Sequence, residues 1–147
     1  MPALRRQIGC VFQDFRLLPN RTVAGNVAFA LEVIGTPRDE IKEVVPNVLE
    51  LVGLTGKEDS YPNEISGGEQ QRVAVVRALI NQPRIILADE PTDNLDHATG
   101  EQIISLLFEA RHSEGASLVL VTHDRGLAQR CDRIAEVSDG RIVKGGL

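Results

Sequence analysis

The chain has 147 residues, of which 42% are hydrophobic and 25% are charged, as in an ordinary globular domain. Its net charge of −5 argues against a nucleic-acid partner or an anionic membrane held by bulk electrostatics. The two cysteines fit no metal-ligand or redox spacing, which indicates a reducing compartment. No apolar run could span a membrane and the N-terminus has no signal-peptide core, so we expect a cytoplasmic chain without direct membrane insertion.

Three short apolar runs along the chain each lead into polar residues that could carry chemistry. The runs cover residues 7–12, 84–88 and 117–121, and they are followed by Gln13, by Asp89 and Glu90, and by Thr122 and His123. Continuous apolar runs of this length are typical of parallel strands buried on both faces. Ligands bind outside the carboxyl ends of such strands, so the pattern predicts one site at one edge of a parallel sheet.

The segment from residue 23 to residue 66 has helical rather than strand periodicity. Apolar residues recur at helical spacing over 26–34 and 38–53, with glycines near the ends of both stretches. We therefore expect a small helical subdomain between the first and second apolar runs. Pro46 lies inside the second helix, where a proline costs about 3 kcal/mol, so we expect a kink or the start of a new helix there.

Two further elements are predicted nearer the C-terminus. Residues 97–112 carry apolar side chains on one helical face and favour a crossover helix between the second and third strands. Residues 133–143 favour a β-hairpin, because Asp139-Gly140 is a strong two-residue turn signal between two strand-like runs.

A glycine-rich helix start follows the helical segment. Ser66 and Glu69 satisfy the S-x-x-E capping box, which by itself indicates only a well-capped helix. Gly67 and Gly68 change that interpretation, because they leave backbone N–H groups bare at a helix N-terminus, where the dipole favours an anion such as a phosphate.

The acidic residues after the second run have both a plain and a chemical interpretation. Asp89 and Glu90 could form a solvated strand end before the turn at Pro91. Adjacent strand residues point in opposite directions, so the two carboxylates are also suited to two distinct roles. Asp96 could cap the following helix. Taken alone, Gln13 or His123 would be an ordinary polar or structural residue.

The order of these motifs carries a specific family resemblance. Gln13, SGGEQQ at 66–71, ILADEPT at 86–92, NLD at 94–96 and THD at 122–124 resemble the Q-loop, signature motif, Walker B strand, D-loop and switch histidine of ATP-binding-cassette (ABC) ATPases. The resemblance covers nearly the whole chain. It implies an α/β P-loop NTPase (RecA-like) fold with a parallel-sheet core and an inserted ABC α-helical subdomain.

The resemblance also implies how the chain is divided. Residues 1–147 would form a single, partial ABC nucleotide-binding domain. Residues 1–22 would be the Q-loop strand and loop, residues 23–82 the helical subdomain with the signature helix, and residues 83–147 the part of the core that carries Walker B, the D-loop and the switch histidine.

By the same resemblance, ATP and Mg²⁺ are the expected cofactors, and four residues would act at the γ-phosphate. Asp89 would support Mg²⁺, and Gln13 would approach both Mg²⁺ and the attacking water. Glu90 would orient and deprotonate that water, and His123 would hydrogen-bond the γ-phosphate. A positioned general base typically contributes about 10² to 10⁴ in rate.

A second group of residues is implied to act between two subunits. In the family the signature segment contacts ATP bound to the opposite subunit of a dimer, and here that segment is Ser66, Gly67, Gly68, Glu69 and Gln70. Asp96 would be the D-loop aspartate at the dimer seam. The expected partner is therefore a second ABC ATPase subunit, in a homo- or heterodimer.

Within the family the chain is most similar to the group that contains the cell-division ATPase FtsE and the lipoprotein-release and MacB-type ATPases. This implies an FtsX-like integral membrane protein as a partner and a peripheral location on the inner face of a bacterial cell membrane. Asp93 stands where glycine is usual in this group, and Val76 where alanine is common. We expect the charge of Asp93, near the phosphate site, to weaken nucleotide closure.

No G-x-x-x-x-G-K-[ST] phosphate loop occurs in the 147 residues. We therefore expect a core that lacks the Walker A strand, an exposed apolar face, and low stability and no activity for the chain alone. Two functions stay open: an ATP-hydrolysing subunit, or a non-catalytic module that completes a heterodimer with an intact ABC subunit. A chromosome-maintenance ATPase is disfavoured, because no sustained heptads lie between Gln13 and Ser66.

Overall fold

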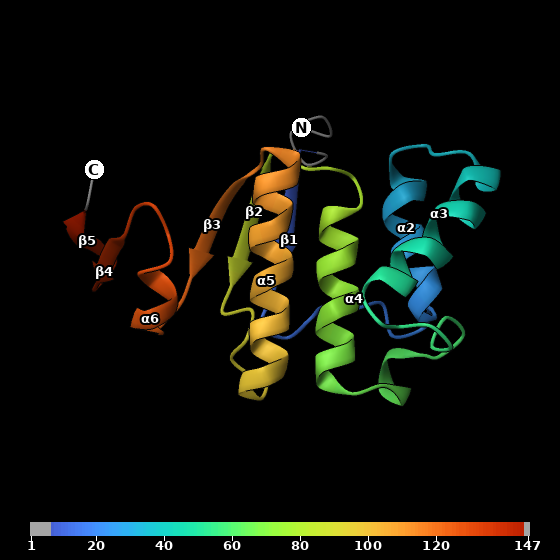
Figure 1. Ribbon diagram of the computed structural model, residues 1–147, viewed down its shortest axis with the longest axis horizontal. Helices are drawn as coiled ribbons and strands as arrows, with labels where there is room; N and C mark the ends of the chain where they lie inside the picture. Colours follow the sequence, from blue (N-terminus) through green and yellow to red (C-terminus); the bar gives the residue numbers. More distant parts are fainter. Residues whose placement is uncertain (1–6, 146–147) are drawn as a thin grey trace.

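A three-stranded parallel sheet forms the centre of the molecule. The computed structural model describes residues 7–145. The sheet contains β1 (Ile8–Val11), β2 (Ile85–Asp89) and β3 (Ser117–Val121) in the order β1-β2-β3, with Ile8 opposite Ile85 and Ile85 opposite Ser117. The helices α4 (Gly67–Leu79) and α5 (His97–Glu114) cover one face of this sheet (Figure 1). The predicted α/β fold and parallel sheet are therefore confirmed.

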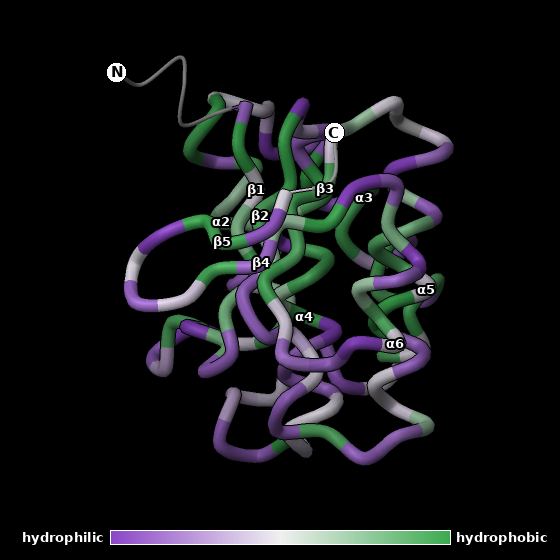
Figure 2. Tube along the Cα trace, turned by 90° about the vertical axis from the view of Figure 1, so that its left-hand side faces the viewer, coloured by the Kyte–Doolittle hydropathy of each residue, from purple (hydrophilic) through white to green (hydrophobic). Residues whose placement is uncertain are grey.

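The opposite face of the sheet is open. This confirms the expected exposed apolar face and corrects the expectation that the strands are buried on both faces. Ile86 and Ala88 of β2 are buried beneath the helices, whereas Leu87 is 39% exposed and, on β3, Val119 and Val121 are 50% and 54% exposed. The strands are hydrophobic along most of their length (Figure 2). A continuous apolar run does not reveal which of the two faces is covered, which is why burial on both faces was expected. No helix of the described residues packs on this second face.

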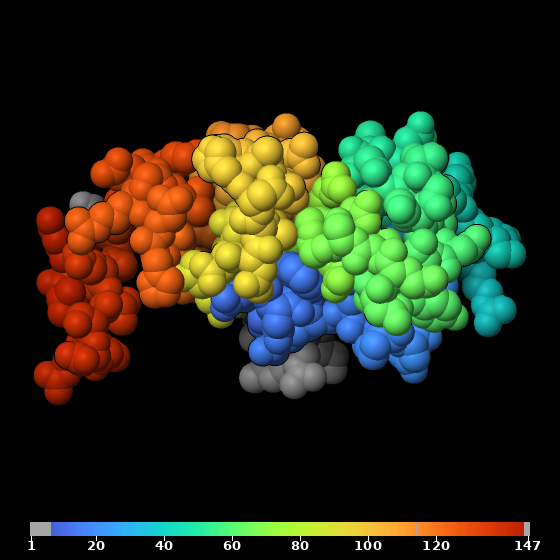
Figure 3. All heavy atoms as spheres, turned by 90° about the horizontal axis from the view of Figure 1, so that it is seen from below, coloured from blue at the N-terminus to red at the C-terminus, as the bar shows by residue number. Residues whose placement is uncertain are grey.

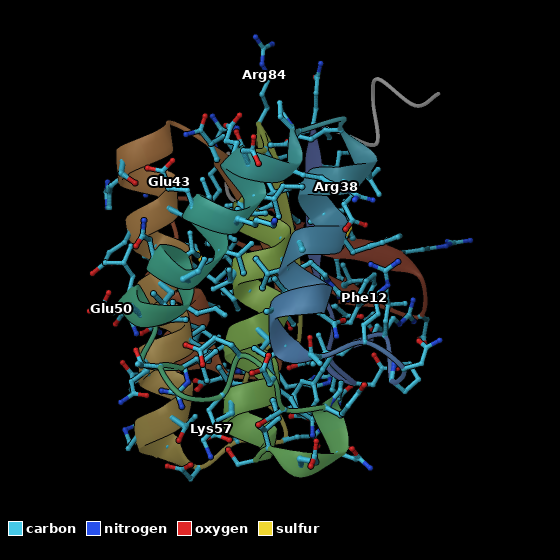
Figure 4. All side chains as sticks on the ribbon, turned by 90° about the vertical axis from the view of Figure 1, so that its right-hand side faces the viewer. Phe12, Arg38, Glu43, Glu50, Lys57 and Arg84 are labelled. Carbon is cyan, nitrogen blue, oxygen red and sulfur yellow. The ribbon has the colours of Figure 1, made fainter. Side chains whose placement is uncertain are left out.

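The helical layer lies beside the sheet and contains α2 (Val23–Val33), α3 (Arg38–Leu51) and the 3₁₀ turn η1 (Pro62–Glu64). On α3, Glu43 and Glu50 lie on the outer side (Figure 4). The helix runs without interruption through Pro46, so the prediction that a new helix begins there was wrong. Pro46 is exposed, and its ring therefore competes with no core side chain.

Helix α4 joins the two hydrophobic cores of the molecule. Its Val75 and Ala78 pack in the sheet core with residues of β2 and α5, and its Val73 and Val76 pack in the core of the helical layer. Gly9 of β1 explains how closely the helix approaches the sheet, because a Cβ atom there would lie 2.4 Å from the carbonyl oxygen of Ala78. The position of α4 is therefore determined from both sides.

The C-terminal part confirms the predicted crossover helix and hairpin. Helix α5 buries Ile103 and Leu107 against the sheet and leads into β3, and the short α6 (Arg125–Ala128) follows. Strands β4 (Ala135–Ser138) and β5 (Arg141–Gly145) pair in antiparallel register, with a bulge at Glu136/Val137. Asp139 and Gly140 both have positive φ, as a two-residue hairpin turn requires. None of the described helices is long and apolar enough to cross a membrane.

Candidate functional site

The carboxyl ends of the three parallel strands bring Gln13, Asp89, Glu90 and His123 to one edge of the sheet. This edge faces the viewer in Figure 3, where the residues after β1 (blue) lie beside the start of α5 (yellow). His123 Nε2 lies 3.1 Å from Glu90 Oε1; the histidine side chain is 93% exposed and the glutamate side chain 13% exposed. Asp89 is exposed at the end of β2, opposite Val121. The predicted gathering of polar groups at this edge is confirmed.

Glu90 has an unusual backbone conformation. Its φ is 44°, in the left-handed region, so it is not a regular strand residue and the argument from strand alternation does not apply to it. Two hydrogen bonds hold the conformation: the Glu90 N–H donates to the carbonyl of Val121 at 2.9 Å, and the Asp93 N–H donates to the carbonyl of Glu90 at 3.2 Å.

The carboxylate of Glu90 is available for a further partner. Oε1 is buried and accepts no hydrogen bond within the described residues, although His123 Nε2 lies 3.1 Å from it. A buried, unpaired carboxylate oxygen is costly unless something completes it, as expected of a group that acts on a water molecule or ligand.

Gln13 is exposed and is held by the loop that follows Glu90. Its side-chain Nε2 donates to Asp93 Oδ2 at 2.6 Å, and its backbone carbonyl accepts from Asn94 Nδ2 at 3.1 Å. The structure thus ties the end of β1 to the segment after β2, which are 80 residues apart along the chain.

The glycine-rich start of α4 forms as predicted. The Glu69 N–H donates to Ser66 Oγ at 3.1 Å, and the Ser66 N–H donates to Glu69 Oε2 at 2.9 Å, which confirms the capping box. The N–H groups of Gly67 and Gly68 lie in the first turn, where a helix has no internal acceptors for them. Gln70 follows, and its Nε2 donates to the carbonyl of Ile65 at 3.4 Å.

Asp96 caps α5, which confirms one of the two roles considered for it. Its carboxylate accepts from the Thr99 hydroxyl at 2.6 Å and from the Thr99 N–H at 3.1 Å. The hydrogen bond from the Thr99 side chain, followed by that from the Thr99 backbone, lowers the pKa of Asp96 from its usual value. Its role at a dimer seam stays a prediction.

Gln71, which was not among the predicted site residues, connects the signature helix to both loops of the site. This side chain is fully buried, and its Nε2 donates to the carbonyl of Pro91 and, at 3.4 Å, to that of Phe12. One signal could have revealed it: Gln71 is a polar residue on the inward face of a helix, between Gly67 and Val73.

Arg77 is a second missed residue. Its guanidinium donates to the carbonyl of Arg16 at 2.7 Å and to that of Phe15 at 3.1 Å. Phe15 and Arg16 have positive φ, so Arg77 holds a strained stretch just after Gln13. Burial lowers the pKa of Arg77 from its usual value.

Asn26 holds the next part of the same loop. It is fully buried on α2, and its side chain accepts from the Leu18 N–H at 2.8 Å and donates to the carbonyls of Leu18, Arg21 and Thr22. An apolar residue would fit helical spacing equally well at this position, so periodicity alone did not single it out.

The model of the ABC transporter family matches residues 1–93. The chain belongs to the ABC transporter family. It is 54% identical over 145 residues to the cell division ATP-binding protein FtsE of Mycobacterium tuberculosis, and 50% identical over 145 residues to the methionine import ATP-binding protein MetN of Carboxydothermus hydrogenoformans. Both comparisons cover 98% of this ABC chain, but only 63% of FtsE and 43% of MetN.

Solved structures show the same fold. The dimeric structure of MJ0796, a bacterial ABC transporter cassette, matches with a TM-score of 0.86 and 39% identity, over 97% of this chain and 64% of that one. The dimeric post-hydrolysis state of MJ0796 bound to ADP and Pi matches with a TM-score of 0.85 and 39% identity, over 97% and 63%. The P-loop NTPase fold predicted for this ABC chain is therefore confirmed.

Proposed function

We propose that this chain carries the hydrolytic and signature residues of an ATP-binding subunit in an ABC-type membrane complex. The observation that carries the proposal is the convergence of Gln13, Asp89, Glu90 and His123 at the carboxyl ends of three parallel strands, with His123 Nε2 3.1 Å from Glu90 Oε1. Family membership supports it, because the motifs occur in the same order.

Glu90 is the proposed general base of ATP hydrolysis. Its carboxylate is mostly buried, and its Oε1 is free of hydrogen bonds from the described residues, so it can accept one from an attacking water. His123 lies beside it, 93% exposed, and is proposed to donate to a phosphate oxygen. Asp89, one residue earlier, is exposed and is proposed to bind Mg²⁺ instead.

The donor groups at this edge fit Mg²⁺. Mg²⁺ is usually bound by one or two carboxylates together with substrate phosphates rather than by a cage of protein ligands. Within residues 7–145 no three His, Cys, Asp or Glu side chains gather to hold a metal ion by themselves. Asp89 and Gln13 would hold the ion, which would neutralise charge on the phosphates.

The start of α4 is the proposed contact with nucleotide on a second subunit. Ser66, Gly67, Gly68, Glu69 and Gln70 present a capped helix N-terminus whose first N–H groups favour a phosphate. The dimeric MJ0796 cassettes, one of them bound to ADP and Pi, support a dimer of ABC subunits, homo- or heteromeric, with Asp96 at its seam.

The cellular role proposed first is FtsE-like: a cytoplasmic ATP-binding subunit on the inner face of a bacterial membrane, coupled to an FtsX-like membrane protein. The 54% identity to FtsE supports it. Transport is the second candidate, because MetN, at 50% identity, is a methionine import protein. The third candidate is a non-catalytic module that completes a heterodimer with an intact ABC subunit.

Glu90→Gln tests the proposal in the protein that carries this chain, assembled with a second ABC subunit. We expect ATP hydrolysis to fall by about 10² to 10⁴ while binding of Mg²⁺-ATP persists, because a neutral amide keeps the shape but not the basicity. Binding is measured as a rise in Tm. At a Mg²⁺-ATP concentration of 100 times the Kd, binding stabilises the fold by about 2.7 kcal/mol.

The matched control is Glu109→Gln, which neutralises an exposed glutamate of α5 outside the site. Hydrolysis unchanged by Glu90→Gln would contradict a catalytic role. If hydrolysis were unchanged by Glu90→Gln but lost on substitution of Ser66, the chain would instead be the non-catalytic module of a heterodimer.

A further inference from the structure

Gln13 is fixed at two points by consecutive residues of one loop. Asp93 accepts from its side-chain Nε2 at 2.6 Å, and Asn94 donates to its backbone carbonyl at 3.1 Å. Asp93 and Gln13 are both exposed, so their contact is not a product of tight core packing. The loop therefore controls where this glutamine lies and which way its amide points.

The orientation of the amide follows from the chemistry of Asp93. An ionised carboxylate only accepts hydrogen bonds, so the NH₂ group of Gln13 must be the end that faces it. A hydrogen bond to a charged acceptor is also stronger than one between neutral groups. Oε1 of Gln13 is consequently turned away, and no described residue donates to it.

Asp93 is also part of the turn that begins at Glu90. Its N–H donates to the carbonyl of Glu90 at 3.2 Å, so it is the fourth residue of a turn whose first residue has the left-handed φ of 44°. Buried Gln71 holds Pro91 in the middle of that turn. The amide of Gln13 is therefore placed relative to the carboxylate proposed as the base.

We propose that Asp93 is a positioning residue: it turns Oε1 of Gln13 outward, where it would serve as an oxygen donor to the Mg²⁺ of bound nucleotide. Because the carboxylate of Asp93 is engaged with this amide, the proposed role replaces the expectation that its charge weakens nucleotide closure. This inference rests on the proposed function, because that function supplies the metal. A methyl group at position 93 could not orient the amide, so Asp93→Ala removes the constraint that the carboxylate supplies.

The first test needs no nucleotide. In ¹⁵N-labelled protein we expect the two side-chain amide protons of Gln13 to be separated more widely than those of exposed Gln102. In Asp93→Ala that separation should collapse to the Gln102 value. The signals are assigned by their loss in Gln13→Ala. A Gln13 signal that does not change in Asp93→Ala would overturn the proposal.

The second test measures the Mg²⁺ concentration that gives half-maximal ATP binding, in a Glu90→Gln background without turnover. Loss of a charge-assisted hydrogen bond should raise that concentration by roughly tenfold in Asp93→Ala. In a Gln13→Ala background the same substitution should have no further effect, because its action passes through the amide. Equal effects in both backgrounds would overturn the proposal.

The matched control is Asp14→Asn, which removes a charge next to Gln13 that pairs with Arg16 rather than with the amide. If it raised the Mg²⁺ requirement as much as Asp93→Ala, general electrostatics would explain the result and the proposal would fail. The amide signals distinguish this failure from failure of the proposed function. If the parent protein bound no Mg²⁺-ATP, the proposed function and the metal role of Asp93 would both fail. The amide signals would still report, without nucleotide, whether Asp93 orients Gln13.

Discussion

Several single residues at or beside the site have a strained backbone conformation that neighbouring groups hold in place. Glu90 adopts a left-handed φ of 44°, and Phe15 and Arg16 do the same at 64° and 48°. Such a conformation costs a non-glycine residue about 1 kcal/mol or more, and it persists only where neighbours hold it. Here the neighbours are the carbonyl of Val121 and the guanidinium of Arg77. Strain gathered around one group of polar residues supports a functional rather than a structural role for them.

Asp96 allows a prediction about pH at the residue scale. Its folded-state pKa is lowered by the hydrogen bonds from Thr99, so its ionised form stabilises the fold. That contribution is complete above the unfolded pKa of about 3.9 and is lost as the pH falls through the lower folded-state value. We expect the Tm of wild type to exceed that of Asp96→Ala at neutral pH, and the difference to shrink in acid.

Melting curves of both proteins between neutral pH and strong acid check this expectation. Asp96→Asn is the control, because asparagine keeps a capping oxygen without a charge. Its Tm relative to Asp96→Ala should therefore stay constant over the acid range. A wild-type advantage that did not change with pH would show that the charge of Asp96 contributes nothing to stability.

At the scale of elements, α4 is the part on which the others depend. It packs on β1, α2 and α5, and it contributes to both hydrophobic cores. Its first turn lies against α5, where a Cβ atom at Gly68 would lie 2.6 Å from Cγ2 of Thr99. A Cβ atom at Gly67 would meet only the ring of Phe15, at 3.7 Å. The two adjacent glycines therefore differ in how much space surrounds them.

We predict that Gly68→Ala lowers the free energy of unfolding by about 1–3 kcal/mol, because the new methyl group overpacks the contact between α4 and α5. Gly67→Ala is the matched control and should be nearly neutral. Thr99→Ser removes Cγ2 but keeps the hydroxyl that caps with Asp96, so it should restore most of the loss in the double variant. Urea unfolding curves give the free energy of unfolding of wild type, of the three single variants and of the double variant. An equal loss of stability for both glycine substitutions would contradict the prediction.

At the scale of the whole molecule, the sheet is covered on one face and open on the other. The open face contains Leu87, Val119 and Val121, which are 39%, 50% and 54% exposed, together with Ile85 at 37%. A contiguous apolar surface of this kind lowers its free energy by leaving water, so it favours association. The covered and open faces follow the alternation of side chains along β2 and β3.

We predict that the purified 147-residue chain associates through this open face. Its sedimentation coefficient should rise with concentration between about 1 and 100 µM. A variant with both Leu87→Lys and Val119→Lys should sediment with much weaker concentration dependence. Leu51→Lys is the matched control, because Leu51 is 83% exposed on α3, away from the sheet. Association that survived the two lysines, or that Leu51→Lys abolished, would contradict the prediction.

Local patterns predicted most of the elements correctly, but not the uninterrupted helix through Pro46 or the short α6. The three apolar runs became β1, β2 and β3, the capping box formed at Ser66, and the turn at Asp139 joined β4 to β5. These features depend on side-chain periodicity and on the conformational preferences of residues close together in the chain. The order of motifs also placed the four polar residues at one edge, because parallel strands end on the same side of a sheet.

Local residue patterns and motif order were enough to predict the family, the strands, the main helices and the polar residues that end the strands, since each is encoded by neighbouring residues or by the order of motifs. Three-dimensional packing was needed to show which side chains form the open face, that α4 belongs to both cores, and that Asp93 accepts a hydrogen bond from the amide of Gln13, 80 residues away. Those outcomes depend on which distant segments meet in space, and a pairing between residues so far apart leaves no periodic signal in a single sequence.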